Sequence, residues 1–232
     1  MFVISGVEKP RAVSANRFSY PSPIVVEFVR FISLLISKAL WFIRYSGRKN
    51  IPTDDRGIVV VSNHPTYLDP VWITLPIRKK LRYMAWDEAF EWRLIGRLIR
   101  YLGAFPVKHR KGITKSAVVE SLRSLRNGAA LVIFPEGERE FADGKMLEFK
   151  TGAVHIALNS GVPILPVSVR GGNRIWPQGQ KYPRLFRRVE IVYHPLMHLP
   201  EKPDDVELDK HLEKLNNELV DIIDPMKREI DR

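Results

Sequence analysis

From residue 57 onward, short apolar runs alternate with longer stretches whose apolar residues recur at helical spacing, and this alternation constrains the fold more than any other feature. The predicted strands are residues 57–62, 81–86, 103–107, 130–134, 163–169 and 189–194. The predicted helices are residues 87–102, 114–127, 151–160 and 205–223. Strands separated by helices in this way predict an α/β fold with a mostly parallel central sheet flanked by helices.

The segment before this pattern, residues 25–44, is the most apolar stretch of the chain. A membrane span needs roughly 20 predominantly apolar residues, and charged residues interrupt this segment. As a helix it is amphipathic, with its polar residues on an arc of about 140° that also holds Leu34 and Trp41. We predict a helix that lies in a membrane interface, with its apolar face in the lipid and its cations toward lipid phosphates. The alternative is a surface helix packed on the core.

The chain has 232 residues, of which 45% are hydrophobic and 27% charged, as in ordinary globular proteins. We predict two parts: a lead-in with the amphipathic helix (residues 1–44), and one main domain with a C-terminal helix (residues 45–232). The chain contains no cysteine, which excludes disulfides, thiolate metal sites and a cysteine nucleophile. The absence of cysteine fits a cytosolic protein. The first ten residues have no basic n-region and too short an apolar run for a secretory signal.

The net charge of +11 indicates an anionic partner. Nucleic acid, an anionic lipid surface, a phosphorylated small molecule and an acidic carrier protein are the candidates. A nucleic-acid interface requires aromatic residues interleaved with basic ones on an exposed surface. Most aromatic residues here lie instead within apolar helical stripes and strands, so we expect no nucleic-acid partner.

The sequence SNHPTYLDP places His64 just after a predicted strand, where α/β folds collect their ligands. An offset of five residues is about 140° on a helix, so His64 and Asp69 can meet only if the chain turns between them. Asp69-Pro70 is typical of a helix start, with the aspartate as N-cap. An aspartate on one imidazole nitrogen leaves the other as a general base. The alternative is that Asp69 only caps a helix and His64 is a turn residue.

A general base also requires a nucleophile. The chain has neither a Gly-x-Ser-x-Gly motif nor a cysteine, so the hydroxyl of a substrate is the natural candidate. The remaining histidines show no metal-ligand spacing, and we predict no metal site.

Two further stretches place charged residues at strand ends. In LVIFPEGERE, Gly137 permits a tight turn between Glu136 and Arg139, and the arginine can bind a phosphate through two hydrogen bonds. In GAFPVKHRKG, Lys108 and Arg110 are cations that could hold an anion. The alternatives are an exposed charged turn and a solvated basic loop.

The stretches NHPTYLDP, GAFPVKHR, FPEGERE and VPILPVSV, in this order, resemble the four signature blocks of the glycerolipid acyltransferases. The likeness is closest to the bacterial 1-acylglycerol-3-phosphate (lysophosphatidic acid) acyltransferases and covers roughly residues 45–195. The resemblance implies that His64 is the general base and that Asp69 orients it. The main domain is then an acyltransferase domain.

The resemblance also implies a binding role for residues outside the His/Asp pair. Glu136, Gly137 and Arg139, together with Arg110, would shape the pocket for the phosphate of the acceptor. Lys108 lies in the same block as Arg110, and Lys150 in FKTGA resembles a family lysine just after the third block, so both are further candidates. Pro163 matches the proline of the fourth block, which the family ties to the acyl donor.

Two positions depart from the family pattern. The third block usually reads Glu-Gly-Thr-Arg, whereas Glu138 stands here in place of the threonine. Many relatives carry a lysine before the second block, where this chain has Trp86. An added carboxylate and a lost ammonium each weaken anion binding, by about 1–3 kcal/mol for a charged hydrogen bond.

We therefore expect an O-acyltransferase that moves a fatty acyl group from acyl-CoA or acyl carrier protein to the free hydroxyl of 1-acylglycerol-3-phosphate, making phosphatidic acid. The thioester is a co-substrate, and we expect no metal or organic cofactor. The enzyme would act at the cytoplasmic face of a membrane with anionic lipid, as a peripheral or monotopic protein. The alternatives are the same chemistry on glycerol-3-phosphate or another lyso-lipid, and a non-catalytic peripheral membrane protein.

Overall fold

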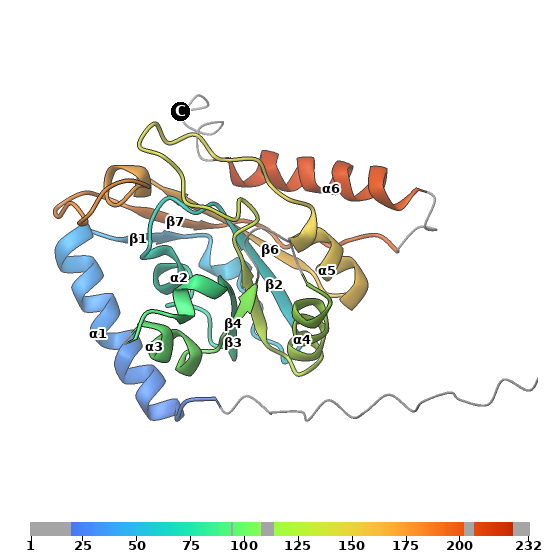
Figure 1. Ribbon diagram of the computed structural model, residues 1–232, viewed down its shortest axis with the longest axis horizontal. Helices are drawn as coiled ribbons and strands as arrows, with labels where there is room; N and C mark the ends of the chain where they lie inside the picture. The colour runs from blue at the N-terminus through green and yellow to red at the C-terminus, as the bar shows by residue number, and fades with distance from the viewer. Residues whose placement is uncertain (1–19, 94, 108–113, 202–206, 225–232) are drawn as a thin grey trace, which may run out of the picture.

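The computed structural model describes residues 20–93, 95–107, 114–201 and 207–224, and within these ranges seven strands form one sheet (Figure 1). The strand order is β1-β7-β6-β2-β5-β3-β4. The strands are β1 (Arg44–Ser46), β2 (Ile58–Ser62), β3 (Leu81–Trp86), β4 (Ala104–Val107), β5 (Ala130–Ile133), β6 (Ile164–Arg170) and β7 (Glu190–Tyr193). All neighbours are parallel except β6 and β7. The predicted α/β fold with a mostly parallel sheet is confirmed.

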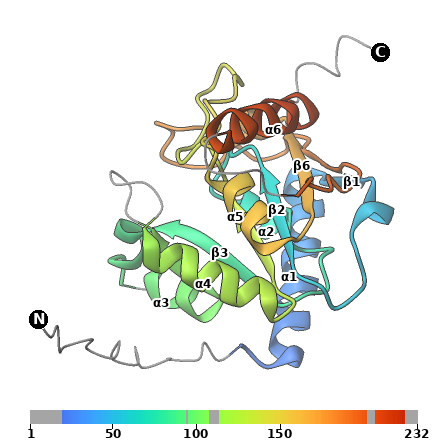
Figure 2. The same cartoon turned by 90° about the vertical axis from the view of Figure 1, so that its right-hand side faces the viewer.

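Helices cover both faces of the sheet, so its central strands β2, β5 and β6 are buried on both sides. On one face lie α4 (Lys115–Arg126), α5 (Gly152–Ser160) and α6 (Leu208–Ile223); on the other lie α1 (Pro23–Trp41) and the short α2 (Asp69–Trp72). Figure 2 shows the first group in front of the sheet and α1 behind it. In β2, Val59 and Val61 point into the first core, and Ile58 and Val60 into the second. This alternation follows from the pleat of a strand.

The six predicted strands and three of the four predicted helices lie within a few residues of their predicted bounds. The predicted helix 87–102 is instead a 3-10 turn (Asp87–Phe90) followed by α3 (Ile95–Tyr101). The two pieces pack closely, because a Cβ on Gly96 would lie 2.3 Å from the carbonyl oxygen of Phe90. The strand β1 was not predicted, since three residues carry too little periodicity to distinguish a strand from a loop.

The predicted N-terminal helix is α1, and it contacts the rest of the protein through its more polar side. Ser37 is buried and accepts a hydrogen bond from the indole nitrogen of Trp72 (3.0 Å). The ring of Trp41 packs edge-on against the same indole, with 5.5 Å between ring centroids. Leu34 also packs on this core. Leu34 and Trp41, the two apolar residues on the predicted polar arc, therefore both face the protein.

The apolar side of α1 faces outward. Phe28 and Phe31 are each 65% exposed, and Ile24 and Leu35 are exposed as well. The apolar face of α1 therefore does not pack on the core, and its role in a membrane interface stays a prediction. Within the described ranges, none of the helices combines the length and apolar character needed to cross a bilayer.

Candidate active site

The site residues of the first and third blocks meet because β2 and β5 are parallel neighbours. Val61 of β2 pairs with Ile133 of β5, so the two strands end at the same edge of the sheet. His64 follows the first strand and Glu136 follows the second. Carboxyl ends of parallel strands are the usual location of ligand sites in α/β folds.

The His64 imidazole contacts the Asp69 carboxylate, with 2.9 Å between Nδ1 and Oδ2. Asp69 is fully buried at the start of α2, and its side chain accepts hydrogen bonds from the backbone N–H and the hydroxyl of Thr66 (2.7 Å each). The carboxylate thus points back to the turn. The N-cap of α2 is Leu68, so the prediction that Asp69 is the N-cap is wrong by one residue. A carboxylate at Nδ1 favours the tautomer with hydrogen on that nitrogen and leaves Nε2 able to accept a proton.

The rest of the His64 ring is held by packing and is accessible at one edge. Its ring stacks on Phe134, with 4.0 Å between centroids and 21° between planes. The side chain is 17% exposed, and no hydrogen bond from the described residues reaches Nε2. This arrangement suits a base that receives a proton from an incoming group.

Glu136 links the His64 loop to the segment that follows the third block. Its Oε1 accepts the backbone N–H of His64 and its Oε2 that of Leu147, both at 2.7 Å. Burial raises the pKa of Glu136 to about 7, despite these two hydrogen bonds, and the nearby Asp69 raises it further. Because both carboxylate oxygens bind backbone groups, Glu136 shapes the site from within the protein.

A second buried pair, Asn63 and Glu140, was not singled out from the sequence. The Asn63 amide donates to Glu140 Oε1 (2.7 Å), and its oxygen accepts the backbone N–H of Val169 (2.7 Å). The backbone N–H of Glu140 donates to the carbonyl of His64 (3.0 Å). Burial, followed by the charge of Glu136, raises the pKa of Glu140 to about 9. The sequence signal that could have identified this pair is its location: Asn63 lies in the block NHPTYLDP and Glu140 in the block FPEGERE.

The Arg139 guanidinium lies against the ring of Tyr67, with its central carbon 3.5 Å from the ring centroid. It donates to the carbonyls of Trp176 and Pro177 (3.1 Å each) through Nη1. Arginine also carries N–H groups on Nη2 and Nε that these two bonds do not use. The cation is therefore positioned by an aromatic ring and two carbonyls, in a partly buried environment.

Gly137 and Lys150 lie close together at this turn. Gly137 has a φ of 74°, in the left-handed region that favours glycine. A Cβ at this position would lie 3.0 Å from Lys150 Nζ, which places the ammonium group over the turn. Lys150 also lines a groove of about 820 Å³ between residues 145–151 and α6.

One of the predicted binding residues, Pro163, is not brought into this cluster. Pro163 precedes Ile164, which pairs with Val59, so it lies at the amino edge of the sheet, whereas His64 lies beyond the opposite edge. Parallel strands place their amino ends together, so Pro163 lies away from His64. Its role on the acyl-donor side stays a prediction. Lys108 and Arg110 lie outside the described residues.

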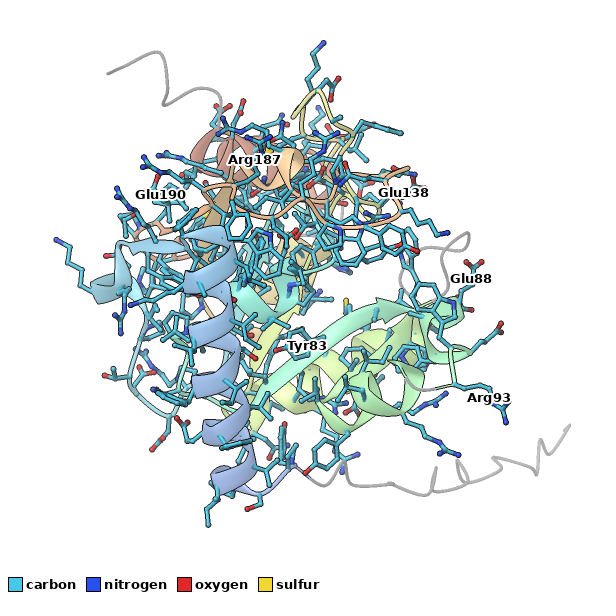
Figure 3. All side chains as sticks on the ribbon, turned by 90° about the vertical axis from the view of Figure 1, so that its left-hand side faces the viewer. Tyr83, Glu88, Arg93, Glu138, Arg187 and Glu190 are labelled. Carbon is cyan, nitrogen blue, oxygen red and sulfur yellow. The ribbon has the colours of Figure 1, made fainter. Side chains whose placement is uncertain are left out.

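The two positions that depart from the family pattern are at the same edge as His64. Trp86 ends β3, the neighbour of β5, and is 36% exposed. Glu138 is half-buried in the turn after β5. Figure 3 shows Glu138 and Glu88, which follow the ends of β5 and β3, on the same side of the molecule.

The chain matches the Acyltransferase family over residues 42–170. The chloroplastic 1-acyl-sn-glycerol-3-phosphate acyltransferase LPAT1 of Arabidopsis thaliana is 29% identical over 67% of this chain and 44% of its own length. The 1-acyl-sn-glycerol-3-phosphate acyltransferase of Bacillus subtilis is 27% identical over 69% of this chain and 79% of its own. The chain thus spans less than half of the plant protein and most of the bacterial one.

A solved structure shares both the fold and part of the sequence. The crystal structure of the 1-acyl-sn-glycerophosphate (LPA) acyltransferase PlsC from Thermotoga maritima superposes with a TM-score of 0.64 at 28% identity, covering 85% of this chain and 79% of that one. The family match covers more than half of the sequence and includes His64, Asp69 and the third block. This protein therefore belongs to the acyltransferase family.

Proposed function

We propose that the protein transfers a fatty acyl group from an acyl thioester to the free hydroxyl of 1-acylglycerol-3-phosphate, forming phosphatidic acid. The observation that carries this proposal is the 2.9 Å contact between His64 and a buried Asp69, at the strand edge where α/β folds bind ligands. Relatives named as acyltransferases for this acceptor support the substrate assignment.

The proposed reaction uses Nε2 of His64 as a general base. It accepts the hydroxyl proton as the acceptor oxygen bonds to the carbonyl carbon of the thioester. The tetrahedral intermediate then collapses, the carbon–sulfur bond breaks, and the proton passes from Nε2 to the departing thiolate. The products are the ester and a free thiol. Asp69 holds the tautomer and stabilises the imidazolium that forms between the two proton transfers.

The acceptor phosphate would bind on the side of the turn that carries the cations. Arg139 has N–H groups beyond those that bind Trp176 and Pro177, and Lys150 lies over Gly137. Arg110 and Lys108 are expected to add charge from the second block. Holding the phosphate would present one hydroxyl to His64, and such positioning lowers the entropic barrier to reaction.

A second acceptor is favoured by one observation. Trp86 occupies the position of a family lysine and lies, 36% exposed, at the end of β3, the strand next to β5. An indole offers apolar surface in place of an ammonium group. This exchange favours another lyso-lipid as the second candidate acceptor, with the same chemistry.

We also propose that the protein acts at the cytoplasmic face of a membrane. The outward apolar side of α1, with Phe28 and Phe31 exposed, supports an interfacial helix rather than a packed one. Both an acyl-CoA and an acyl carrier protein could reach the site from the aqueous side.

The test is thioester-dependent acylation by the purified protein in mixed lipid vesicles. Acyl-CoA and acyl carrier protein would each be tried against 1-acylglycerol-3-phosphate, glycerol-3-phosphate and other lysophospholipids. We expect phosphatidic acid from the first acceptor and a free thiol in equal amount. No acyl transfer to any hydroxyl acceptor would reject the proposal, and transfer to a different acceptor alone would select the alternative.

A further inference from the structure

Residues 181–188 (KYPRLFRR), here called the basic loop, carry four cations and no acidic residue. Tyr182 and Phe186 are 69% and 65% exposed, and Leu185 is exposed beside them. We propose that the basic loop is a second lipid-binding element, which inserts Leu185 and Phe186 into an anionic membrane next to α1. The proposal rests on the membrane location proposed above but not on any choice of acceptor or donor.

The backbone of the basic loop is fixed, so the exposure of its side chains does not result from a loose connection. The N–H of Arg184 donates to the carbonyl of Ile175 (2.9 Å), which anchors the loop to the main domain. The N–H of Phe186 donates to the carbonyl of Leu40 (2.7 Å), and the indole nitrogen of Trp41 donates to the carbonyl of Arg184 (2.9 Å). The last two bonds join the loop to the final turn of α1.

Two phenylalanines at this junction adopt a backbone conformation that is unusual for their type. Phe186 has a φ of 56° and Phe42, directly after α1, has a φ of 46°. Glycine or asparagine would adopt this left-handed conformation more easily. The two rings contact each other, with 6.4 Å between centroids, yet both remain largely exposed. Burial inside the protein therefore does not explain why phenylalanine occupies these positions.

The basic loop extends the outward apolar side of α1. Figure 1 shows the segment before β7 beside the upper end of α1, and Figure 3 shows Arg187 just above the same end. Along α1, Phe28 and Phe31 face outward, and Phe42 continues this side to Phe186. The result is one apolar surface that runs the length of the helix, about 28 Å at 1.5 Å per residue, and ends on the basic loop.

The charges of the loop identify an anionic lipid surface as its partner. The cations are Lys181, Arg184, Arg187 and Arg188, and all four are exposed around the apolar side chains. Long cationic side chains can place their alkyl parts among acyl chains while their charges stay at the phosphates. Aromatic rings such as that of Tyr182 favour the same interfacial depth. An acidic protein would match the charges but would not be expected to cover the whole length of α1.

The experiment measures partitioning of the full chain into vesicles of phosphatidylcholine with and without phosphatidylglycerol. In the double variant Leu185→Ser/Phe186→Asn, asparagine tolerates the left-handed backbone while the apolar contacts are lost. We expect partitioning into the mixed vesicles to fall by at least about tenfold, because burying one such side chain is worth that factor or more. Val119→Ser is the matched control, since Val119 is 65% exposed on α4, across the sheet from α1.

A double variant that unfolds at the wild-type temperature and still partitions like wild type would overturn the proposal. So would a variant that loses affinity for acidic acyl carrier protein but keeps its affinity for vesicles, because the loop would then be a protein-docking surface. Acyl transfer to a short-chain, water-soluble acceptor should be unchanged in the double variant. Partitioning can thus be lost or kept independently of whether the acylation assay succeeds.

Discussion

Proteins usually bury apolar side chains and expose polar ones. The side chains around His64 and those on the outer side of α1 depart from this rule in opposite directions. Beside His64, five polar or acidic residues are buried: Asn63, Thr66, Asp69, Glu136 and Glu140. Along α1, large apolar side chains point outward. Burying a polar group costs free energy unless the group is hydrogen-bonded. Apolar surface in contact with water also costs free energy, which is regained when the surface is covered.

The two departures are compensated in different ways. Each member of the buried cluster has a hydrogen-bond partner inside the protein, so its free-energy cost is offset within the folded chain. On the outer side of α1, the apolar side chains can leave water only by contact with a lipid membrane or another molecule. Changes in the cluster should therefore alter turnover or folding, whereas changes on the outer side of α1 should alter only association with a membrane.

The largest effect is expected from removal of the imidazole. His64→Ala should lower turnover by about 10²–10⁴-fold, the usual contribution of general-base catalysis, with little change in thermal unfolding. The exposed His198 provides the control variant His198→Ala, which should retain wild-type turnover. Near-complete activity of His64→Ala in the acylation assay would show that His64 is not the general base. The buried polar cluster around it would then have no catalytic role to explain its cost.

A smaller loss is expected at Glu140. Glu140→Ala leaves one N–H of the buried Asn63 amide without its acceptor, while the other still donates to the carbonyl of Val169 (3.1 Å). Such a defect is worth about 1–3 kcal/mol of unfolding free energy. We expect a lower kcat as well, because the pair positions the backbone of His64, and little change in the KM of the acceptor. Glu140→Gln keeps an acceptor oxygen and should recover most of both losses in denaturant titrations and kinetics. Equal defects in the two variants would argue that the pair does not act through this hydrogen bond.

The same cluster predicts an unusual dependence of stability on pH. Burial raises the pKa of Glu136 to about 7 and that of Glu140 to about 9, above the ordinary value of 4.5. Between the ordinary and the raised pKa the folded state binds more protons than the unfolded state, so the free energy of unfolding falls as pH rises. We expect the unfolding temperature to decrease from pH 5 toward pH 9, and to decrease less in Glu140→Gln. A rising unfolding temperature over this range would contradict the assignment.

The smallest effect on folding is expected on α1. Phe31→Ser should change the free energy of unfolding by no more than about 0.5 kcal/mol, as for other exposed positions, while it lowers partitioning into anionic vesicles. Leu219→Ala on α6 is the reference, because this fully buried leucine should cost about 2–5 kcal/mol. Similar losses of stability in the two variants, measured by denaturant titration, would show that α1 packs through its apolar side after all.

Much of the fold could be predicted because its signals are local. The alternation of apolar strands and helical stretches predicted the sheet. Thr114, the first residue of the predicted helix 114–127, is the N-cap of α4, and its hydroxyl accepts the N–H of Ala117 (3.3 Å). The His64/Asp69 pair was also predicted as a contact, because both residues lie in one short turn. Whether this pair is catalytic stays a prediction.

What only the tertiary structure decided depends on residues far apart in the chain. Asn63 and Glu140 meet across 77 positions because β2 and β5 are neighbours. Pro163 lies at the opposite edge of the sheet from His64 because it precedes its strand. The helices α1 and α6 make the same point: both are amphipathic, yet α6 buries its apolar side and α1 exposes it. Periodicity defines the faces of a helix, but the surface that each face meets is set by the packing of the whole chain.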